Sequence, residues 1–166
     1  MYITDYNRQL ELISEMRQLR RDTQKVEVYY HHPYSNQMWK SFFPRANEQK
    51  LGPKLLRHEP VPSNIEENLE ICLTEEDPEN AIGLGIEWSV KAHLWNEIIQ
   101  ELEQHYSNYL RKQLKLFLKH LRMSEIQQVE RENETDQSTL PISEDQLNEL
   151  VWRSRKIRMK RFFVLG

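Results

Sequence analysis

Hydrophobic and polar residues alternate along residues 81–90, and the run that follows, residues 91–123, has the spacing of a helix. Because successive side chains of a strand point to opposite faces, the first pattern predicts a strand. The apolar face of this strand consists of Ile82, Leu84, Ile86, Trp88 and Val90. The second pattern predicts one long amphipathic helix. Its apolar face consists of Trp95, Ile99, Leu102, Tyr106, Leu110, Leu114, Phe117 and Leu121.

A continuous helix over residues 91–123 would be about 50 Å long at roughly 1.5 Å per residue, which is more than a small domain needs. This length favours a break near Ser107 and Asn108. The leucines of residues 114–118 also alternate at every second position, so a short strand is the alternative there.

The N-terminal part of the chain predicts one helix followed by a β-hairpin. Residues 4–22 carry apolar side chains at helical spacing, and Thr4 or Asp5 can cap the start of this helix. Residues 25–32 are rich in Val and Tyr, as strands are. After a turn sequence, residues 38–43 form the second strand of the hairpin.

Residues 44–62 are rich in proline and predict a long loop that packs irregularly over the sheet. Long loops are often functional, so a functional loop is the alternative. Ser63 and Glu66 have the spacing of a capping box, which predicts that a short acidic helix begins there. The buried face of this helix consists of Ile65, Leu69 and Cys72.

The predicted fold is α+β: a small antiparallel sheet, made of the hairpin plus a third strand, packs with helices that include the long amphipathic one. Residues 1–123 form the core domain. Residues 124–142 are polar, lack periodicity and predict a linker. Residues 143–166 form a C-terminal basic helix and tail, opened by a second capping box. The buried face of this helix consists of Leu147, Leu150, Val151, Ser154 and Ile157.

Composition narrows the class of protein. The 166 residues suit one domain with a core of its own, and only four are glycine, which disfavours a glycine-rich nucleotide cradle. The single cysteine, Cys72, excludes an intrachain disulfide and indicates a reducing compartment. No run approaches the roughly 18 apolar residues of a membrane span, and the first residues lack the apolar core of a signal peptide. These features predict a soluble cytoplasmic protein that does not bind membranes.

The formal net charge of −3 conceals strong segregation of charge. Residues 58–90 contain nine acids and no Lys or Arg, whereas residues 104–124 contain five bases and no acid. Residues 153–161 then hold six bases. Segregation of this kind indicates charged partners and says nothing about the fold. The basic run at residues 111–122 resembles a membrane-surface or groove-binding helix in composition, but core packing is the favoured interpretation.

The sequence contains no constellation typical of an enzyme. G-x-S-x-G, H-E-x-x-H and C-x-x-C do not occur, and Cys72 falls on a buried helix face. We therefore predict a non-catalytic protein without a cofactor. One stripe has the four-residue spacing of helix-borne metal sites, but a solvated helix flank is the favoured interpretation and no metal site is predicted. The stripe consists of His93, Glu97, Glu101 and His105.

Aromatic side chains and histidines crowd the hairpin, which predicts a recognition surface. With the acidic helix, this surface predicts a protein–protein interaction module of the adaptor, inhibitor or assembly-factor kind, whose partner is another, basic protein. The predicted contact residues are Tyr30, His32, Tyr34, Trp39, Glu66, Glu67 and Glu70. The sequence leaves the oligomeric state open.

The alternative function is RNA or DNA binding through the C-terminal basic cluster, because Lys and Arg at this density neutralise phosphates. The residues that would carry it are Arg153, Arg155, Lys156, Arg158, Lys160 and Arg161. The alternating glycines Gly83 and Gly85 indicate close approach by another element, with a tightly packed helix favoured over a ligand.

Overall fold

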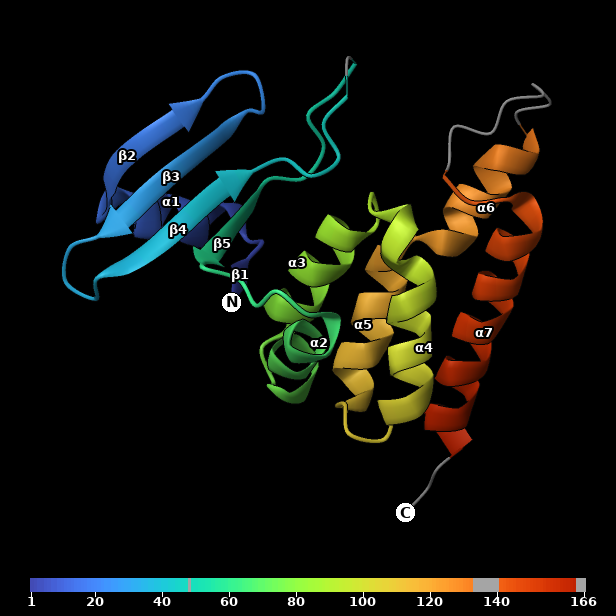
Figure 1. Ribbon diagram of the computed structural model, residues 1–166. Coiled ribbons are helices and arrows are strands. Elements are labelled where there is room, and N and C mark those ends of the chain that lie inside the picture. The colour runs from blue at the N-terminus through green and yellow to red at the C-terminus, as the bar shows by residue number, and fades with distance from the viewer. Residues whose placement is uncertain (48, 133–140, 164–166) are drawn as a thin grey trace.

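The computed structural model describes residues 1–47, 49–132 and 141–163, which form an antiparallel sheet beside a bundle of helices (Figure 1). The fold is α+β, as predicted. The described strands form one five-stranded sheet in the order β1-β5-β4-β3-β2. The strands are β1 (Tyr2–Ile3), β2 (Arg17–Asp22), β3 (Glu27–His32), β4 (Gln37–Phe42) and β5 (Leu55–Glu59).

Helix α1 (Tyr6–Ser14) lies against one face of the sheet, and the other helices lie beyond the edge formed by β1 (Figure 1). Most buried apolar side chains come from these other helices, so the main core lies inside the bundle and reaches the sheet through β1 and β5. In chain order they are α2 (Ile65–Thr74), α3 (Pro78–Trp88), the short 3-10 helix η1 (Ala92–Leu94), α4 (Trp95–His105), α5 (Arg111–Leu121), α6 (Met123–Glu132) and α7 (Glu144–Phe163).

The prediction of a helix over residues 4–22 is wrong in its second half. Asp5 caps α1 as predicted, but the arginine-rich segment that follows is strand β2 and pairs with β3. The guanidinium of Arg20 lies 4.6 Å from the ring centroid of Tyr29, across that pair. Helical spacing is a local signal, and here the cross-strand pairing overrides it.

The predicted loop at residues 44–62 contains strand β5, which lies between β1 and β4. Leu55 and Leu56 are fully buried, because β5 is paired on both sides and faces the core. Helix α2 then begins one residue later than predicted. Its N-cap is Asn64, whose side-chain oxygen accepts a hydrogen bond from the backbone N–H of Glu67 at 2.7 Å.

The prediction of a strand at residues 81–90 is wrong, because helix α3 occupies most of this range. Asp77 caps the helix and Pro78 lies in its first turn, and both are start signals. Helix α3 is enclosed by β1, α2 and α5, so residues on almost every side of it are buried. A helix buried all round need not show a 3.6-residue period, and its apolar residues here happen to alternate.

The predicted long helix over residues 91–123 is divided into η1, α4 and α5. The break after α4 falls at residues 106–110 and includes Ser107 and Asn108, where the length argument favoured it. Residues 114–118 are helical, so the strand alternative there is wrong.

The segment at residues 124–142, predicted to be a linker, contains most of helix α6, which contacts α7. Residues 133–140 lie outside the described residues. Helix α7 begins as predicted: Ser143 and Gln146 exchange hydrogen bonds of 3.0 and 3.3 Å in a capping box. Its predicted apolar face is buried. Within the described part of the chain, no helix combines the length and apolar composition that crossing a bilayer requires.

Candidate functional site

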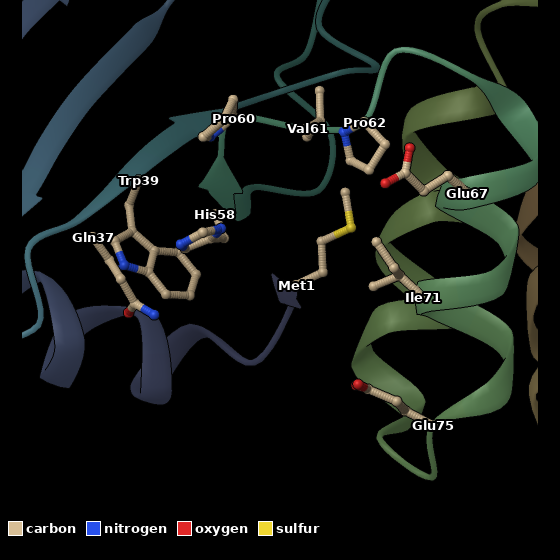
Figure 2. Close-up of a pocket in the computed structure, with 10 residues that line it drawn as sticks. All are labelled: Met1, Gln37, Trp39, His58, Pro60, Val61, Pro62, Glu67, Ile71 and Glu75. Atoms are coloured by element: carbon tan, nitrogen blue, oxygen red, sulfur yellow. The ribbon is translucent and has the colours of Figure 1, made fainter.

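A groove with a volume of about 520 Å³ opens between strands β4 and β5 and helix α2 (Figure 2). One wall comes from the sheet, the other from α2, and the segment that joins β5 to α2 lies along the top in this view. Apolar and acidic side chains line it without any Lys or Arg. The lining residues are Met1, Gln37, Trp39, His58, Pro60, Val61, Pro62, Glu67, Ile71 and Glu75.

Trp39 and His58 form the sheet wall of the groove. They are cross-strand partners in β4 and β5, so their side chains share one face of the sheet. Their ring centroids lie 5.4 Å apart at an interplanar angle of 84°, an edge-to-face contact. The indole N–H of Trp39 is buried and finds no hydrogen-bond partner among the described residues. Packing therefore holds this ring in place.

Helix α2 presents the opposite wall through Glu67, Ile71 and, just beyond its end, Glu75 (Figure 2). Residues four apart in a helix lie on one face, which explains why these three line the groove together. Glu67 is exposed and lies in the first turn, where a carboxylate also suits the helix dipole. The carboxylate of Glu75 accepts a hydrogen bond from the side chain of Asn80 at 3.3 Å.

Met1 lies between the two walls (Figure 2). Its backbone nitrogen donates a hydrogen bond to the side-chain oxygen of Asn80 at 2.6 Å, and its sulfur lies 3.6 Å from the sulfur of Cys72. Burial raises the pKa of the Cys72 thiol to about 12, so the sulfur stays protonated at neutral pH. Cys72 therefore supplies no thiolate beside Met1.

A second cavity, of about 350 Å³, shares Val61 and Pro62 with the groove. The carboxylate of Glu87 accepts hydrogen bonds there from the hydroxyl of Tyr2 at 2.9 Å, from Arg57 at 2.6 Å and from Lys91 at 2.7 Å. Arg57 also donates to Glu59 at 2.5 Å. These groups satisfy one another and join the sheet to α3, which gives the cluster a structural role.

The electrostatic surroundings of Glu87 explain its charge. Burial alone would raise the pKa of its carboxyl, but the positive charges of Arg57 and Lys91 outweigh burial and hold the pKa below its ordinary value. The same burial, together with the charge of Glu87, raises the pKa of Tyr2 well above its ordinary value. Glu87 is therefore ionised and Tyr2 neutral at physiological pH.

Of the predicted contact residues, Trp39 and Glu67 come together in the groove. Tyr30 is the cross-strand neighbour of Trp39 in β3 but is not among the lining residues. His32 and Tyr34 do not line the groove, although His32 pairs with the lining residue Gln37 across β3 and β4. Their ring centroids are 6.0 Å apart and Tyr34, in the turn, is 90% exposed.

Glu66 and Glu70 lie on the side of α2 that faces Tyr109. Burial, the charge of Glu101 and the charges of these two glutamates raise the pKa of Tyr109 to about 12. The acidic helix is therefore divided between two surfaces, and of its predicted contact residues only Glu67 lines the groove.

The predicted nucleic-acid residues of α7 are also divided. Arg153 donates to Glu103 of α4 at 2.8 Å and to Asn96 at 3.2 Å. Lys156 lies 3.6 Å from the ring centroid of Trp152, and Lys160 lies 5.8 Å from that of Tyr106. These three cations are therefore held along the α4 side of α7.

Arg155 and Arg158 are exposed, as Lys156 and Lys160 are. Arg158 lines a small cavity beside the junction of α5 and α6. The side chain of Arg161 lies outside the described residues.

The stripe of His93, Glu97, Glu101 and His105 does not form a metal centre in this structure. Glu101 and His105 pair with each other through the ring nitrogen Nδ1. Among the residues that the structure describes, no group of three or more His, Cys, Asp or Glu is placed to hold a metal ion.

Several groove residues have no sequence signal that singles them out. Met1, Ile71 and Pro60 are ordinary apolar residues, and they line the groove only because β5 brings the chain beside α2. His58 stands out as a histidine in a proline-rich segment, and recognising the short apolar strand around it would have placed it opposite Trp39.

Comparisons with protein-family models, with curated proteins and with solved structures found no match for this chain. The groove itself offers apolar side chains, an aromatic wall, one histidine and two carboxylates.

Proposed function

We propose that this protein is a non-catalytic interaction module, an adaptor, inhibitor or assembly factor, that binds a segment of another protein in the groove between β4–β5 and α2. The segment carries a bulky apolar side chain close to a Lys or Arg. The observation that carries the proposal is the placement of Trp39 and Glu67 on facing walls of one groove.

Shape and apolar character support this occupant. A volume of about 520 Å³ has room for several side chains of a peptide segment. Trp39, Val61 and Ile71 offer apolar area to a buried anchor residue, and aromatic residues of this kind dominate binding energy at interfaces.

Charge supports the basic residue of the segment. Glu67 and Glu75 lie on the same wall, no Lys or Arg lines the groove, and the α-ammonium of Met1 is engaged by the side-chain oxygen of Asn80. A cation of the partner entering beside them would gain a charge-assisted hydrogen bond, and opposite charge would also speed the encounter.

The test uses random peptides displayed on phage and selected on the full chain. We expect enriched peptides to place an aromatic or aliphatic residue within three positions of a Lys or Arg. Their affinities are then measured by fluorescence anisotropy. Glu67→Lys should weaken binding by at least about tenfold, the loss expected when a charge pair becomes a repulsion.

Glu70→Lys is the matched control, since it makes the same charge change on the same helix but does not line the groove. We expect it to change the affinity less than about twofold. Equal losses from Glu67→Lys and Glu70→Lys would show that acidity alone attracts the peptides. That outcome, or a selection without any enriched sequence, would overturn the assignment of the groove.

A further inference from the structure

Helix α5 carries a row of cations on its outer face, far along the chain from the groove residues. Lys115 and Lys119 are exposed and four residues apart, which places them on one side of the helix. Arg111 begins the same row one turn earlier. At roughly 1.5 Å per residue, the row from Arg111 to Lys119 is about 12 Å long. The exposed Arg122 follows the last residue of α5 as its C-cap, with a left-handed backbone.

The stability of α5 does not explain these charges. Arg111 and Lys112 lie in the first turn, which contains no acid, although the helix dipole favours acids there. The apolar residues Leu114, Phe117 and Leu121 are buried in the core. The apolar face is therefore already used in packing, and the exposed Lys115 and Lys119 are left to meet solvent or a ligand.

A small cavity of about 160 Å³ lies at the C-terminal end of this row. Lys119 of α5, Arg122 between α5 and α6, Ser124 of α6 and Arg158 of α7 line it. One acid, Glu125, also lines it and accepts a hydrogen bond from Arg122. The fold thus brings an arginine of the C-terminal cluster to cations that lie more than thirty residues earlier in the chain.

Lys115, Lys119 and Arg158 are available to a ligand, whereas Arg122 is paired with Glu125. Within the described residues, no hydrogen bond or ion pair engages Lys115, Lys119 or Arg158. Burial, together with the positive charges of Lys119 and Arg45, lowers the pKa of the neighbouring His120. Its imidazole is therefore neutral at neutral pH and adds no charge to the surface.

We propose that the α5–α7 cationic surface, defined as Lys115, Lys119, Arg122 and Arg158, binds the phosphate backbone of a nucleic acid, with one phosphate in the cavity. A row of cations repeated every four residues, about 6 Å along the helix axis, suits a linear polyanion, whose strand carries a phosphate charge at every nucleotide. This surface is separate from the groove and does not depend on its function.

The surface also differs from the nucleic-acid site that the sequence suggests. Arg153, Lys156 and Lys160 contact α4 or aromatic rings on the other side of α7. Among the cluster side chains that the structure describes, only Arg158 joins the proposed surface.

The test measures the affinity of the full chain for fluorescein-labelled single-stranded dT15 by fluorescence anisotropy between 25 and 200 mM NaCl. In the variant Lys115→Glu, Lys119→Glu, Arg158→Glu, we expect binding at low salt to weaken at least tenfold. The slope of log K against log salt should fall by about 2, since each lost phosphate contact removes roughly 0.7 for a single strand. The matching Gln variant removes the same charges without repulsion and should show a smaller loss in the same direction.

The control variant, Arg17→Glu, Arg21→Glu, Lys25→Glu, makes the same charge change at exposed positions in and next to β2. We expect it to retain affinity within about threefold, because it leaves the proposed surface intact. Equal losses of affinity in both variants would show that dT15 is attracted by positive charge anywhere on the protein, and would overturn the proposed site. Undetectable binding of dT15 at 25 mM NaCl would also overturn it.

Vesicles of phosphatidylserine and phosphatidylcholine form the second arm of the test. The proposal would be overturned if the protein bound vesicles more tightly than dT15 and the α5–α7 variant lost this vesicle binding. The surface would then be assigned to a membrane. Peptide binding in the groove is measured on the same variants, so failure of one proposal can be told from failure of the other.

Discussion

At the scale of single residues, Glu87 shows how one carboxylate joins two parts of the molecule. It projects from α3, is 5% exposed, and receives hydrogen bonds from Tyr2 and Arg57 of the sheet and from Lys91. A buried ion pair adds little over an apolar pair of the same shape, but removing one partner leaves the other charge buried alone. Glu87 should therefore be intolerant of neutralisation.

Glu87→Gln tests this role. The amide keeps the size of the side chain but leaves Arg57 without a buried counter-charge on α3, so we expect a loss of about 3 kcal/mol in the free energy of unfolding. Urea unfolding followed by circular dichroism measures it. Glu97→Gln, an identical change at an exposed position of α4, should stay within about 0.5 kcal/mol. Equal effects of the two changes would contradict the structural role of Glu87.

Residue type gave useful but incomplete guidance to the candidate site. Trp39 and Glu67 could be selected from the sequence because a tryptophan in a hairpin and a glutamate on an acidic helix are recognition residues by type. Their meeting depends on β5, a strand that the sequence pattern did not reveal. Tyr34 and Glu70 are of the same types, and only the fold shows that they lie outside the groove.

At the scale of elements, α3 depends on two glycines for its close contacts. A Cβ atom at Gly83 would lie 2.5 Å from side-chain atoms of Tyr2 in β1, and one at Gly85 would lie 2.8 Å from the backbone oxygen of Phe117 in α5. The sequence correctly indicated close approach at both positions, and it favoured a helix as the approaching element. A helix approaches Gly85, whereas a tyrosine of the sheet approaches Gly83.

Gly83→Ala tests this packing. In an exposed helix, the change would stabilise the protein by about 1 kcal/mol, because alanine is the better helix former. Here the added methyl group must displace the Tyr2 ring, so we expect a net destabilisation of about 1 to 3 kcal/mol. Thermal unfolding gives the sign directly. A rise in the melting temperature would show that the Tyr2 side chain does not obstruct a methyl group at position 83.

Elements defined by local signals were predictable, and those defined by distant pairing were not. The capping box of Ser143 and Gln146 and the face of α7 lie within one stretch of chain, as do the β3–β4 hairpin and its turn. Strand β2 is a strand because β3 lies beside it, and β5 because β1 and β4 do. The buried helix α3 lacks a polar face, so its period carried no information about its type.

At the scale of the whole molecule, the sheet and the helical bundle differ in how deeply they are buried. Strand β2 is almost wholly exposed and β3 is half-buried throughout, whereas α3 and α5 contain many buried residues. The junction between the two parts relies on polar contacts of α3: Glu87 with Tyr2 and Arg57, and Glu79 with Thr4, Asp5 and Arg8. The sheet should therefore open at a lower free energy than the bundle.

Acid should loosen this junction before it unfolds the bundle. For both Glu79 and Glu87, burial would raise the pKa, but hydrogen bonds and neighbouring cations outweigh it and leave the pKa below its ordinary value. A lowered pKa in the folded state means that each carboxylate contributes its full stability above its ordinary pKa of about 4.3. That contribution is lost as the pH falls through the lower, folded-state pKa.

We expect hydrogen exchange read by mass spectrometry to show this loss as a separation of the two parts, after correction for the effect of pH on intrinsic exchange. Between pH 7 and pH 3, the amides of β3, β4 and β5 should lose protection by at least about tenfold more than those of α5, since about 1.4 kcal/mol of opening free energy corresponds to tenfold. The variant Glu79→Gln, Glu87→Gln should already exchange rapidly in the sheet at pH 7 and change less on acidification. Equal losses of protection in sheet and bundle would instead indicate that the two parts unfold as one cooperative unit. The carboxylates of α3 would then not stabilise the sheet separately from the bundle.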